Sequence, residues 1–388
     1  MDISLQILFW ISVFAVFHSY VLFPFILKLK ARNKKGNSIC YNSSENLPEI
    51  SIITASYNEE KDIEKKIHST FNTNYPKDKI EFLIGSDNSN DKTNEIITHL
   101  SEIYKQIKFY PFQKRTGKIS IINQLKTKAK NDILILTDTK VFFKEDTIYH
   151  LIKHFKNPDI KMVGGVLQNN KLNKNDISKQ EDAYMSREMK IKYDEGLIWG
   201  SSMGIFGAIY AVKKENLADI PSNFKVDDFF VSMKVIENDG KVIFEKNALA
   251  EEKITGNIKE EFKRKVRIAT GNFQNWVEFT SLLKNPFTGK AFCFISHKLI
   301  RWAGPLFILI AFISNLFILN HLLYQISIII FLITFIIPLF DYMLKKMHIN
   351  INLFRYFTHF YGMNIALVTG FFIFLKGVES AIWEPSKR

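Results

Sequence analysis

The sequence predicts an α/β fold, in which a doubly wound sheet forms a soluble domain and transmembrane helices flank that domain at both ends. Three observations support this prediction. Short apolar runs alternate with amphipathic runs from Leu47 to about Thr288. Long runs without Asp, Glu, Lys or Arg precede and follow this segment, in a chain of 388 residues of which 47% are hydrophobic. Two aspartates follow apolar runs where strands are expected to end, and α/β folds bind their ligands at that edge.

The first uncharged run lies between Asp2 and Lys28, and at about 1.5 Å per residue a helix of that length crosses a bilayer. A cleaved signal peptide would have a basic segment before the apolar run and small residues at a cleavage site. Both are absent, and the basic stretch KLKARNKK follows at once. We therefore expect an uncleaved span over residues 1–29 with a cytosolic basic flank, and a polar linker over residues 30–48.

Seven runs in the soluble segment predict the sheet and its helices. The expected strands are EISIITASYN (49–58), IEFLIGSD (80–87), IKFYPF (107–112) and DILILTDTKVFF (132–143). The expected helices are EEKDIEKKIHSTFN (59–72), KTNEIITHLSEIY (92–104) and GKISIINQLKTKA (117–129). Strands that alternate with helices in this way predict a parallel, doubly wound sheet whose site lies at the carboxyl ends of the strands.

Two more uncharged runs follow the soluble segment. Trp302–Phe340 is about twice as long as one crossing requires, so it predicts a hairpin of two spans that turns near Asn320. Tyr356–Leu375 predicts a further span, which completes a membrane region over residues 303–376. Before this region, FCFISHKLIRW has basic residues among aromatic ones and predicts an interfacial helix over residues 286–302.

The formal net charge of +13 is compatible with nucleic-acid binding. The positions of the basic residues in the chain favour a different explanation. Many lie beside the apolar runs, where the positive-inside rule and anionic lipids account for them: Lys28, Lys30, Arg32, Lys34, Lys35, Lys298, Arg301, Lys345 and Lys346. We therefore expect a lipid bilayer as partner and no nucleic acid. The two cysteines are far apart in the chain and form no disulfide framework, which suits a reducing cytosolic face.

Asp87 and Asp138 each end an apolar run. Taken singly, each aspartate is better explained as a turn residue or a helix N-cap than as a binding residue. At the edge of a parallel sheet, however, carboxylates also accept hydrogen bonds from a nucleobase or ribose, or bind Mg²⁺ or Mn²⁺ against a diphosphate.

Seven motifs occur in one order that resembles the membrane-embedded family 2 glycosyltransferases, the group of the cellulose, hyaluronan and poly-N-acetylglucosamine synthases. They are ITASYNEEKDI, SDNSNDKT, GKISIINQ, LTDTK, GAIYAVKKE, VDDFF and RKVRIATGN. The resemblance covers about Glu49 to Asn272 and implies a GT-A-type glycosyltransferase domain over residues 49–285. It also implies an inverting enzyme that takes a sugar from a nucleotide sugar, and Mg²⁺ or Mn²⁺ as cofactor.

The resemblance assigns roles to individual positions. It implies that Asp87 binds the nucleotide base beside Tyr57, Asn58 and Glu59, and that Asp138, the first residue of a D-x-D motif, meets the metal and the diphosphate. The remaining implied site residues are Lys118 near the nucleotide, Gly207 and Ala208 under the donor sugar, Asp228 as catalytic base beside Asp227, and Arg264 and Arg267 on the Q-x-x-R-W helix.

These roles agree with the chemistry of glycosyl transfer. A base must take the proton of the acceptor hydroxyl, and positive charge must surround the departing diphosphate. Asp228 would supply the first function. The metal ion with Lys118, Arg264 and Arg267 would supply the second, because guanidinium groups match phosphate oxygens. The alternative for the basic run KRKVR is a solvated helix face.

Two departures from the family pattern concern the site. Lys140 occupies the third position of D-x-D, so only Asp138 of that motif can bind metal, and the Lys140 ammonium would contact phosphate instead. Arg264 and Ile268 replace the glutamine and tryptophan of Q-x-x-R-W, a motif that helps to place the acceptor chain in processive relatives.

The predicted function is a multi-pass enzyme of the inner (plasma) membrane with a cytosolic catalytic domain, which uses a UDP-sugar to build a surface polysaccharide. Two alternatives stay open: transfer of one sugar to a polyprenyl-linked acceptor, and an inactive nucleotide-binding membrane protein. Four predicted spans are few for an export channel, so an oligomer or an export partner is a further expectation.

The same four spans would place the tail, residues 377–388, outside the cell. Trp383 in this tail, however, resembles segments that relatives keep on the cytosolic face near the active site. One late segment is therefore expected to be interfacial or re-entrant.

Overall fold

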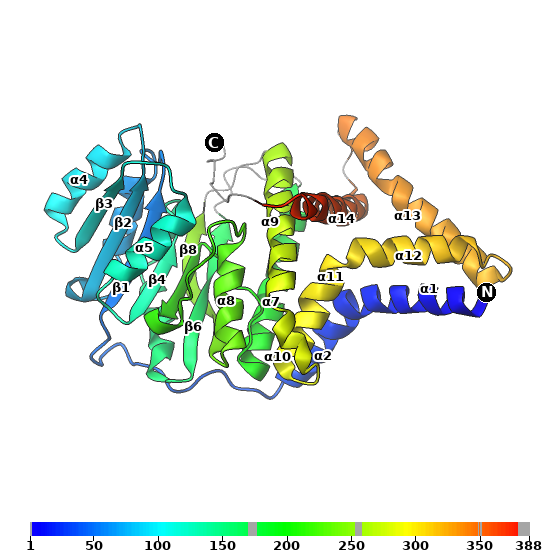
Figure 1. Ribbon diagram of the computed structural model, residues 1–388, viewed down its shortest axis with the longest axis horizontal. Helices are drawn as coiled ribbons and strands as arrows, with labels where there is room; N and C mark the ends of the chain where they lie inside the picture. The colour runs from blue at the N-terminus through cyan, green and yellow to red at the C-terminus, as the bar shows by residue number, and fades with distance from the viewer. Residues whose placement is uncertain (1, 170–176, 253–257, 348, 350, 379–388) are drawn as a thin grey trace.

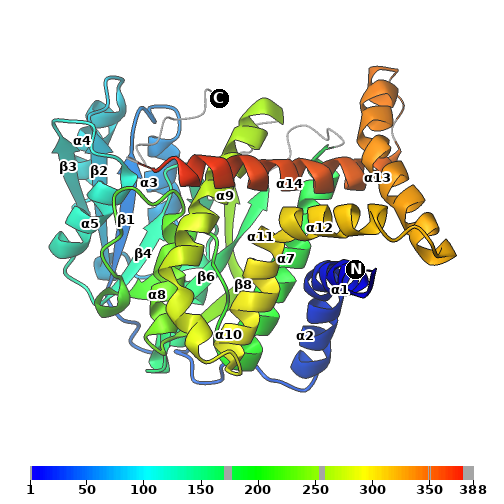
Figure 2. The same ribbon diagram turned by 45° about the vertical axis from the view of Figure 1, so that its right-hand side comes forward.

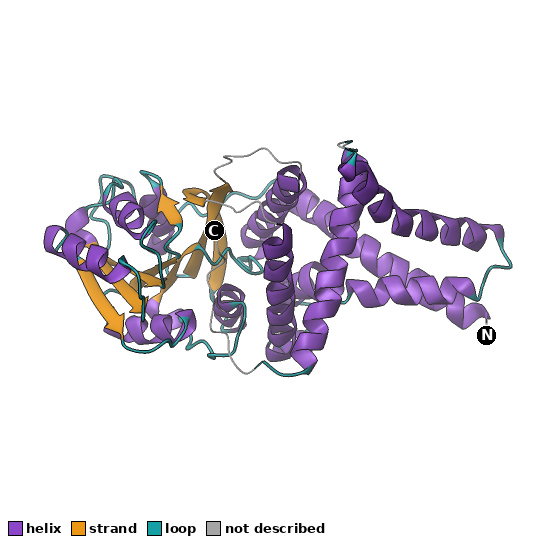
Figure 3. Ribbon diagram, turned by 90° about the horizontal axis from the view of Figure 1, so that it is seen from above, coloured by secondary structure: helices purple, strands orange, loops and turns teal. Residues whose placement is uncertain are grey.

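The computed structural model describes residues 2–169, 177–252, 258–347, 349 and 351–378. A sheet domain with helices on both faces lies at one end, and the long apolar helices extend from its other side (Figure 1). Seen from above, the strands gather on one side of the molecule and the longest helices on the other (Figure 3). The predicted α/β fold with flanking apolar helices is confirmed. Trp383 lies outside the described residues.

The sheet has eight strands in the order β3-β2-β1-β4-β7-β6-β8-β5. Its parallel part consists of β1 (Ile50–Ser56), β2 (Ile80–Asp87), β3 (Ile107–Phe112) and β4 (Ile133–Thr137). The other strands are β5 (Val141–Phe143), β6 (Ile160–Asn169), β7 (Ile209–Lys213) and β8 (Lys241–Glu252). Because β7 is antiparallel to both β4 and β6, the sheet is mixed, and the expectation of a wholly parallel sheet was wrong for this half.

The run expected as one strand over residues 132–143 is broken into β4 and β5. The Lys66 side chain bridges the break. Its ammonium is fully buried and donates hydrogen bonds to Thr137 Oγ1 at 2.9 Å and to the Val141 carbonyl at 2.7 Å. It thus ties the end of β4 to the start of β5, which pairs with β8. Asp138 lies between the two strands, at the edge of the sheet.

Helices cover both faces of the sheet because the apolar residues of its strands alternate between two cores. One core lies under α3 (Ile63–Phe71), α4 (Thr93–Ile103) and α6 (Thr147–Ile152). The other lies under α5 (Lys118–Lys128), α7 (Ile177–Trp199) and α8 (Asp227–Glu237). In α3, for example, Ile63, Ile67 and Phe71 recur every four residues and are fully buried, which gives this helix one apolar face.

Among the described residues, three helices are long and apolar enough to cross a membrane. The first is Ile3–Ala31, which runs through α1 (Asp2–Phe17), η1 (His18–Leu22) and α2 (Phe23–Ala31), and the others are α13 (Leu322–Lys346) and α14 (Asn352–Leu375). Gly289–Trp302, which comprises α10 (Gly289–Cys293), η6 (Phe294–Leu299) and α11 (Ile300–Trp302), meets α12 (Gly304–Leu316) at a bend of 63°. If this bent pair forms one span, the described residues contain four candidate spans.

The last apolar helix lies against the sheet domain. Figure 2 shows α14 running across α9 (Ile258–Glu278), in a view that looks nearly along α1. Rings of Phe273 on α9 and Phe371 on α14 meet edge to face with centroids 5.1 Å apart. A Cβ atom at Gly370 would lie 2.6 Å from the Cβ of Ala269, so the absence of a side chain permits this close approach. The helix thus has one side packed on α9 of the sheet domain.

The junction between the sheet domain and residues 289–302 is charged and buried. His297 lies between two carboxylates of α7, with Nδ1 2.7 Å from Glu195 Oε1 and Nε2 3.0 Å from Glu188 Oε2. Arg301 also pairs with Glu188, and Lys298 lies 3.6 Å from it. The two basic residues expected as interfacial anchors therefore bind a carboxylate of the sheet domain, which fixes this helix to α7.

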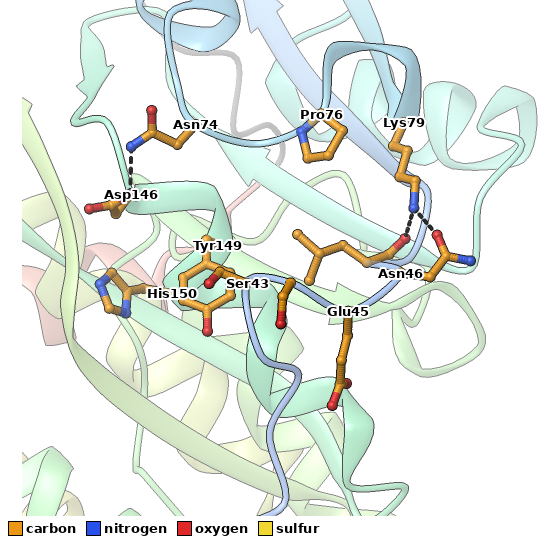
Figure 4. A pocket seen from close by; sticks show the side chains of 11 residues that line it. Ser43, Glu45, Asn46, Asn74, Pro76, Lys79, Asp146, Tyr149 and His150 are labelled. Carbon is orange, nitrogen blue, oxygen red and sulfur yellow. Dashed lines mark hydrogen bonds between the residues drawn. The ribbon is translucent and has the colours of Figure 1, made fainter.

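A polar cavity of about 600 Å³ lies at the amino ends of β1 and β2 (Figure 4). The linker before β1 forms one wall with Asn46, whose side chain accepts a hydrogen bond from Lys79. Opposite, Asn74 donates to Asp146 at 2.9 Å. The predicted site lies at the other edge of the sheet, so this cavity is separate from it.

Candidate active site at the carboxyl edge of the sheet

Three adjacent parallel strands end at one edge and deliver the predicted nucleotide-binding residues there. β2 ends at Asp87, β1 leads into Tyr57, and β4 leads into Asp138. Their register is continuous, because β1 pairs with both neighbours. The structure thus brings together the residues that the sequence assigned to a nucleotide, at the edge where α/β sheets bind ligands.

Asp87 is 4% exposed and binds the loop before α5. Its carboxylate accepts hydrogen bonds from the backbone N–H of Thr116 at 2.6 Å, the backbone N–H of Gly117 at 3.1 Å and Arg115 Nε at 3.1 Å. The Arg115 guanidinium lies over the Tyr57 ring, 3.4 Å from its centroid. This stacked pair forms a flat polar surface beside Asp87. Sequence reasoning missed Arg115, although its position just before the G-K pair was a signal.

The loop after β1 is fixed by the loop after β2. Asn58 has the left-handed conformation with φ of 52°. Its backbone N–H donates to Ser89 Oγ at 3.1 Å, and its side chain accepts from the Asn90 N–H at 3.0 Å. Because both bonds join residues that are about thirty positions apart, they hold the two loops together as one wall of the site.

Glu59 pairs with the residue that departs from the D-x-D pattern. Its carboxylate is buried and lies 3.1 Å from the Lys140 ammonium. The third position of the motif therefore faces Glu59 in the structure. This geometry does not support the expectation that Lys140 contacts a phosphate, and it leaves Asp138 with other partners.

Lys118 lies between two carboxylates that come from different elements. Its ammonium is 2.8 Å from Asp138 Oδ1, after β4, and 3.4 Å from Asp227 Oδ2, at the start of α8. Lys118 is the first residue of α5, after Gly117 with φ of 84°. Burial alone would lower the pKa of the Lys118 ammonium, but the charges of Asp138 and Asp227 outweigh it and raise that pKa. The ammonium is thus a permanent positive charge in the site.

Asp228 lies beside this group, on the side of Gly207. Burial, with a second contribution from the charge of Asp227, raises the pKa of Asp228 to about 6. Its Oδ1 accepts the backbone N–H of Phe229 at 2.8 Å. A carboxylate of this kind is ionised at neutral pH and is a stronger base than an ordinary aspartate, which suits proton abstraction. The backbone carbonyl of Ala208, next to Gly207, accepts a hydrogen bond from the Asp138 N–H at 3.3 Å and so ties the start of β7 to Asp138.

Replacing Gly207 with alanine is expected to lower turnover by displacing Asp228. A Cβ atom at position 207 would lie 2.6 Å from Asp228 Oδ2, so the carboxylate would have to move. The measurement is the turnover number of Gly207→Ala against Gly36→Ala, where a Cβ atom meets nothing within 4 Å. A small misplacement of a catalytic group lowers the rate by about 10²-fold, so we expect a difference of this order between the two variants. Equal turnover numbers would show that Asp228 is not a catalytic group held in place by Gly207.

Tyr210 is a further site residue that sequence reasoning missed. It lines one pocket with Lys118, Gly207 and Asp227, is 1% exposed, and its hydroxyl has no hydrogen-bond partner among the residues that the structure describes. Burial, followed by the charge of Asp227, raises the pKa of this hydroxyl. A tyrosine within the apolar strand AIYAV was the only sequence signal.

The two arginines of the Q-x-x-R-W helix have other neighbours in the structure. Arg264 forms an ion pair with Glu261 on the same helix, with N–O distances of 2.9 and 3.1 Å. Arg267 is exposed. The pKa of Lys225 is lowered mainly by the burial of Lys225 and in second place by the positive charge of Arg267. Their role around a diphosphate stays a prediction.

The described residues contain no group of three or more His, Cys, Asp or Glu side chains with metal-binding geometry. Asp138 and Asp227 nevertheless direct one oxygen each at a single cation, the Lys118 ammonium. Mg²⁺ is commonly bound by one or two carboxylates together with substrate phosphates. This pair of carboxylates therefore fits a divalent cation that is shared with a bound diphosphate.

Comparison with known proteins gives one family and several relatives. Residues 51–219 match the model of Glycosyl transferase family 2. Over 161 residues the chain is 32% identical to a dolichyl N-acetyl-α-D-glucosaminyl phosphate 3-β-D-2,3-diacetamido-2,3-dideoxy-β-D-glucuronosyltransferase of Methanococcus voltae, covering 39% of this chain and 46% of that protein. Over 260 residues it is 26% identical to a poly-β-1,6-N-acetyl-D-glucosamine synthase of Staphylococcus epidermidis, covering 65% and 61%. The matched segments span less than two thirds of these relatives.

A solved structure has the same fold along nearly the whole chain. The mannosyltransferase PcManGT of Pyrobaculum calidifontis, in complex with GDP-Man and Mn²⁺, superposes with a TM-score of 0.71 and covers 95% of this chain and 99% of its own. The two sequences are 17% identical, so this likeness concerns the fold alone.

Proposed function

Because residues 51–219 belong to glycosyl transferase family 2, we propose that the whole protein is a membrane-bound, inverting glycosyltransferase that uses a nucleotide sugar and a divalent cation. The observation that carries the proposal is the convergence of Asp138, Lys118, Asp227 and Asp228 beside a pocket wall at the carboxyl edge of the sheet. Three or four candidate spans support a membrane location. The catalytic domain is proposed to face the cytosol of a plasma membrane.

The proposed reaction assigns one step to each group. The Asp228 carboxylate takes the proton of an acceptor hydroxyl while that oxygen attacks the anomeric carbon of the donor sugar. The bond from this carbon to the diphosphate breaks, the electron pair leaves with the diphosphate, and the configuration inverts. Lys118 supplies positive charge to the leaving group. Asp138 would hold a divalent cation, which would supply further positive charge to the leaving group.

The donor base is proposed to bind on the stacked pair of Tyr57 and Arg115, next to Asp87. A planar base stacks well on such a surface, and Asp87 holds the Arg115 loop beside it through three hydrogen bonds. A UDP-sugar is the proposed donor, on the strength of the polysaccharide synthases among the relatives. GDP-Man, the ligand of PcManGT, is the alternative to be included in any donor panel.

Two acceptors are proposed. A growing polysaccharide is supported by the match to poly-β-1,6-N-acetyl-D-glucosamine synthases, which extends over 65% of the chain in one case. A lipid-linked sugar phosphate, which would receive one sugar, is supported by the name of the Methanococcus voltae relative, whose identity over its shorter match is higher. With at most four candidate spans among the described residues, export of a polymer would need an oligomer or a partner protein.

An inactive nucleotide-binding protein is the weaker alternative. Its main support was Lys140, which replaces the second carboxylate of D-x-D. The 3.1 Å ion pair of Lys140 with Glu59 removes this ammonium from Asp138, so the substitution does not by itself block a cation. A half-buried Asp228 with a raised pKa beside the site also favours catalysis.

The size of the product decides between the two acceptors. We expect the purified protein, given a large excess of donor over acceptor, to form a ladder or a high-mass polymer if it is a synthase. Addition of a single sugar to a polyprenyl-linked acceptor would overturn the polysaccharide proposal and leave the glycosyltransferase proposal intact. Gel filtration and mass spectrometry of the labelled product give this measurement.

A further inference from the structure

The proposed base lies in the first turn of α8, and the residue after it anchors that turn through an aromatic ring. Asp228 Oδ1 accepts the backbone N–H of Phe229 at 2.8 Å, so the carboxylate is held to the Phe229 backbone. The Phe229 side chain is buried. Any contact that fixes the Phe229 ring therefore also fixes the place of the Asp228 carboxylate.

The Phe229 ring contacts two residues that are far apart in the chain. One is Gly204, which has φ of 72°, and a Cβ atom there would lie 2.4 Å from Phe229 Cδ2. The other is Trp302, whose ring centroid is 5.4 Å from that of Phe229, with an angle of 61° between the planes. Aromatic pairs with this spacing and inclination attract each other beyond the burial of their area. Because protein interiors are closely packed, loss of the Trp302 ring would open space into which the Phe229 ring moves.

Trp302 belongs to the apolar helices and not to the sheet domain. It ends the segment Gly289–Trp302, which we call the junction helix, and it directly precedes the bend of 63° into α12. Its ring is buried, with the centroid 6.0 Å from that of Phe294 on the same helix and 6.4 Å from that of Trp276 on α9. The contacts of His297 with α7 fix the junction helix to the sheet domain. Trp302 is thus held from several sides and supports α8 from outside the sheet.

The opposite end of the junction helix offers a second tryptophan for comparison. Trp199, the last residue of α7, packs at the start of this helix, where a Cβ atom at Gly289 would lie 2.2 Å from Trp199 Cδ1. Its ring centroid is 6.0 Å from that of Phe292. Both tryptophans therefore pack on the junction helix, but Trp302 contacts the residue after the base, whereas Trp199 packs on the other end of the helix.

We propose that Trp302 is a positioning residue for the catalytic base: it holds the Phe229 ring in place and thereby fixes the first turn of α8, which carries Asp228. The inference rests on the proposed function, in which Asp228 takes the proton of the acceptor. The nucleotide is proposed to bind elsewhere, on Tyr57 and Arg115 beside Asp87, so loss of Trp302 affects the transfer step and leaves nucleotide binding unchanged. The junction helix thus does more than join the sheet domain to the apolar helices, because it completes the support of the catalytic helix.

The test compares the turnover of purified full-length Trp302→Ala, Trp302→Phe and Trp199→Ala, and their dissociation constants for UDP or GDP, according to the donor that the wild type uses. We expect Trp302→Ala to lower turnover by about 10²-fold, because a small misplacement of a catalytic group has an effect of this size, and to bind the nucleotide like the wild type. Trp302→Phe should keep most of the turnover, since a phenyl ring still meets Phe229 edge to face. Trp199→Ala is the matched control and should turn over like the wild type.

A double variant separates positioning of the base from a general loss of stability. In the Asp228→Asn background the base is already missing, so Trp302→Ala should cause no further loss of turnover. A purely structural effect of Trp302→Ala would lower turnover by the same factor in both backgrounds. Thermal melting shows whether each variant is folded, and Trp302→Leu, which fills more of the space, replaces Trp302→Ala if the latter does not fold.

Several results would overturn the inference, and they differ from the result that would overturn the base assignment in the proposed function. If folded Trp302→Ala or Trp302→Leu turns over like the wild type, Trp302 does not position the base. An equal loss of turnover in Trp199→Ala, or a loss of nucleotide binding in the Trp302 variant, would show that the junction helix supports the whole domain and not Asp228 in particular. A further loss in the double variant would show that Trp302 acts independently of Asp228. Wild-type turnover in Asp228→Asn alone, by contrast, would remove the base itself from the proposed function.

Discussion

Asp228→Asn is expected to lower turnover by about 10²- to 10⁴-fold, the usual contribution of a general base, and to leave nucleotide binding near that of the wild type. An amide has the size of the carboxylate and keeps an oxygen for the Phe229 N–H, but it cannot take a proton from the acceptor. The measurement is the rate at which nucleoside diphosphate is released in the presence of acceptor, together with the dissociation constant of UDP from calorimetry.

The matched control is Asp219→Asn, which makes the same chemical change on the surface, 80% exposed and away from the site. Turnover of Asp228→Asn close to that of this control would remove the base assignment. Loss of both turnover and UDP binding would show instead that Asp228 has a structural role in the pocket.

Removal of divalent cations is expected to have the second large effect. The departing diphosphate carries more negative charge than the Lys118 ammonium can neutralise, and the loss of one such stabilising group typically costs about 10²- to 10³-fold. EDTA should therefore abolish activity, and Mg²⁺ or Mn²⁺ should restore it. In Asp138→Ala neither ion should restore activity at concentrations that saturate the wild type. Full activity in chelator would show that the protein cations neutralise the diphosphate unaided.

The part of the fold that the sequence predicts best is the part with local signals. β1, β2 and β3 are apolar runs bounded by turn residues, and α3, α4 and α5 have apolar residues at helical spacing. Strands that alternate with helices run parallel, so their carboxyl ends lie at the same edge of the sheet. The sequence pattern alone therefore places Asp87 and Asp138 at one edge. The mixed half of the sheet has no comparable signal, because the place of β7 between β4 and β6 depends on pairing across many residues.

The break between β4 and β5 has a local signal that the expectation of one strand passed over. In the sequence, the polar residues TDTK (137–140) separate the apolar runs ILIL and VFF. The role of Lys66, more than seventy positions earlier, is different. Helical spacing places Lys66 on the same face as the buried Ile63 and Phe71 and Lys65 on the exposed face, but the partners of the buried ammonium follow only from the three-dimensional structure.

The site was predicted where single residues match a motif and missed where side chains from different loops combine. Asp138, Lys118 and Asp227 were each expected near the substrate, and the structure brings them within ion-pair distance. The stack of Arg115 on Tyr57 and the orphaned hydroxyl of Tyr210 depend on three-dimensional contacts, so residue type and spacing did not reveal them. Lys140 was correctly seen as a departure, but its partner Glu59 could be found only from the geometry.

A panel of labelled donors tests most directly whether this protein transfers a sugar from a nucleotide sugar. Purified protein is incubated with Mn²⁺, membrane lipids and each labelled UDP-sugar or GDP-Man in turn, with Asp228→Asn as the blank. We predict that at least one donor transfers its label to a lipid or polymer fraction in the wild type and not in the variant. Binding of a nucleotide sugar without transfer from any donor above the Asp228→Asn blank would contradict the account.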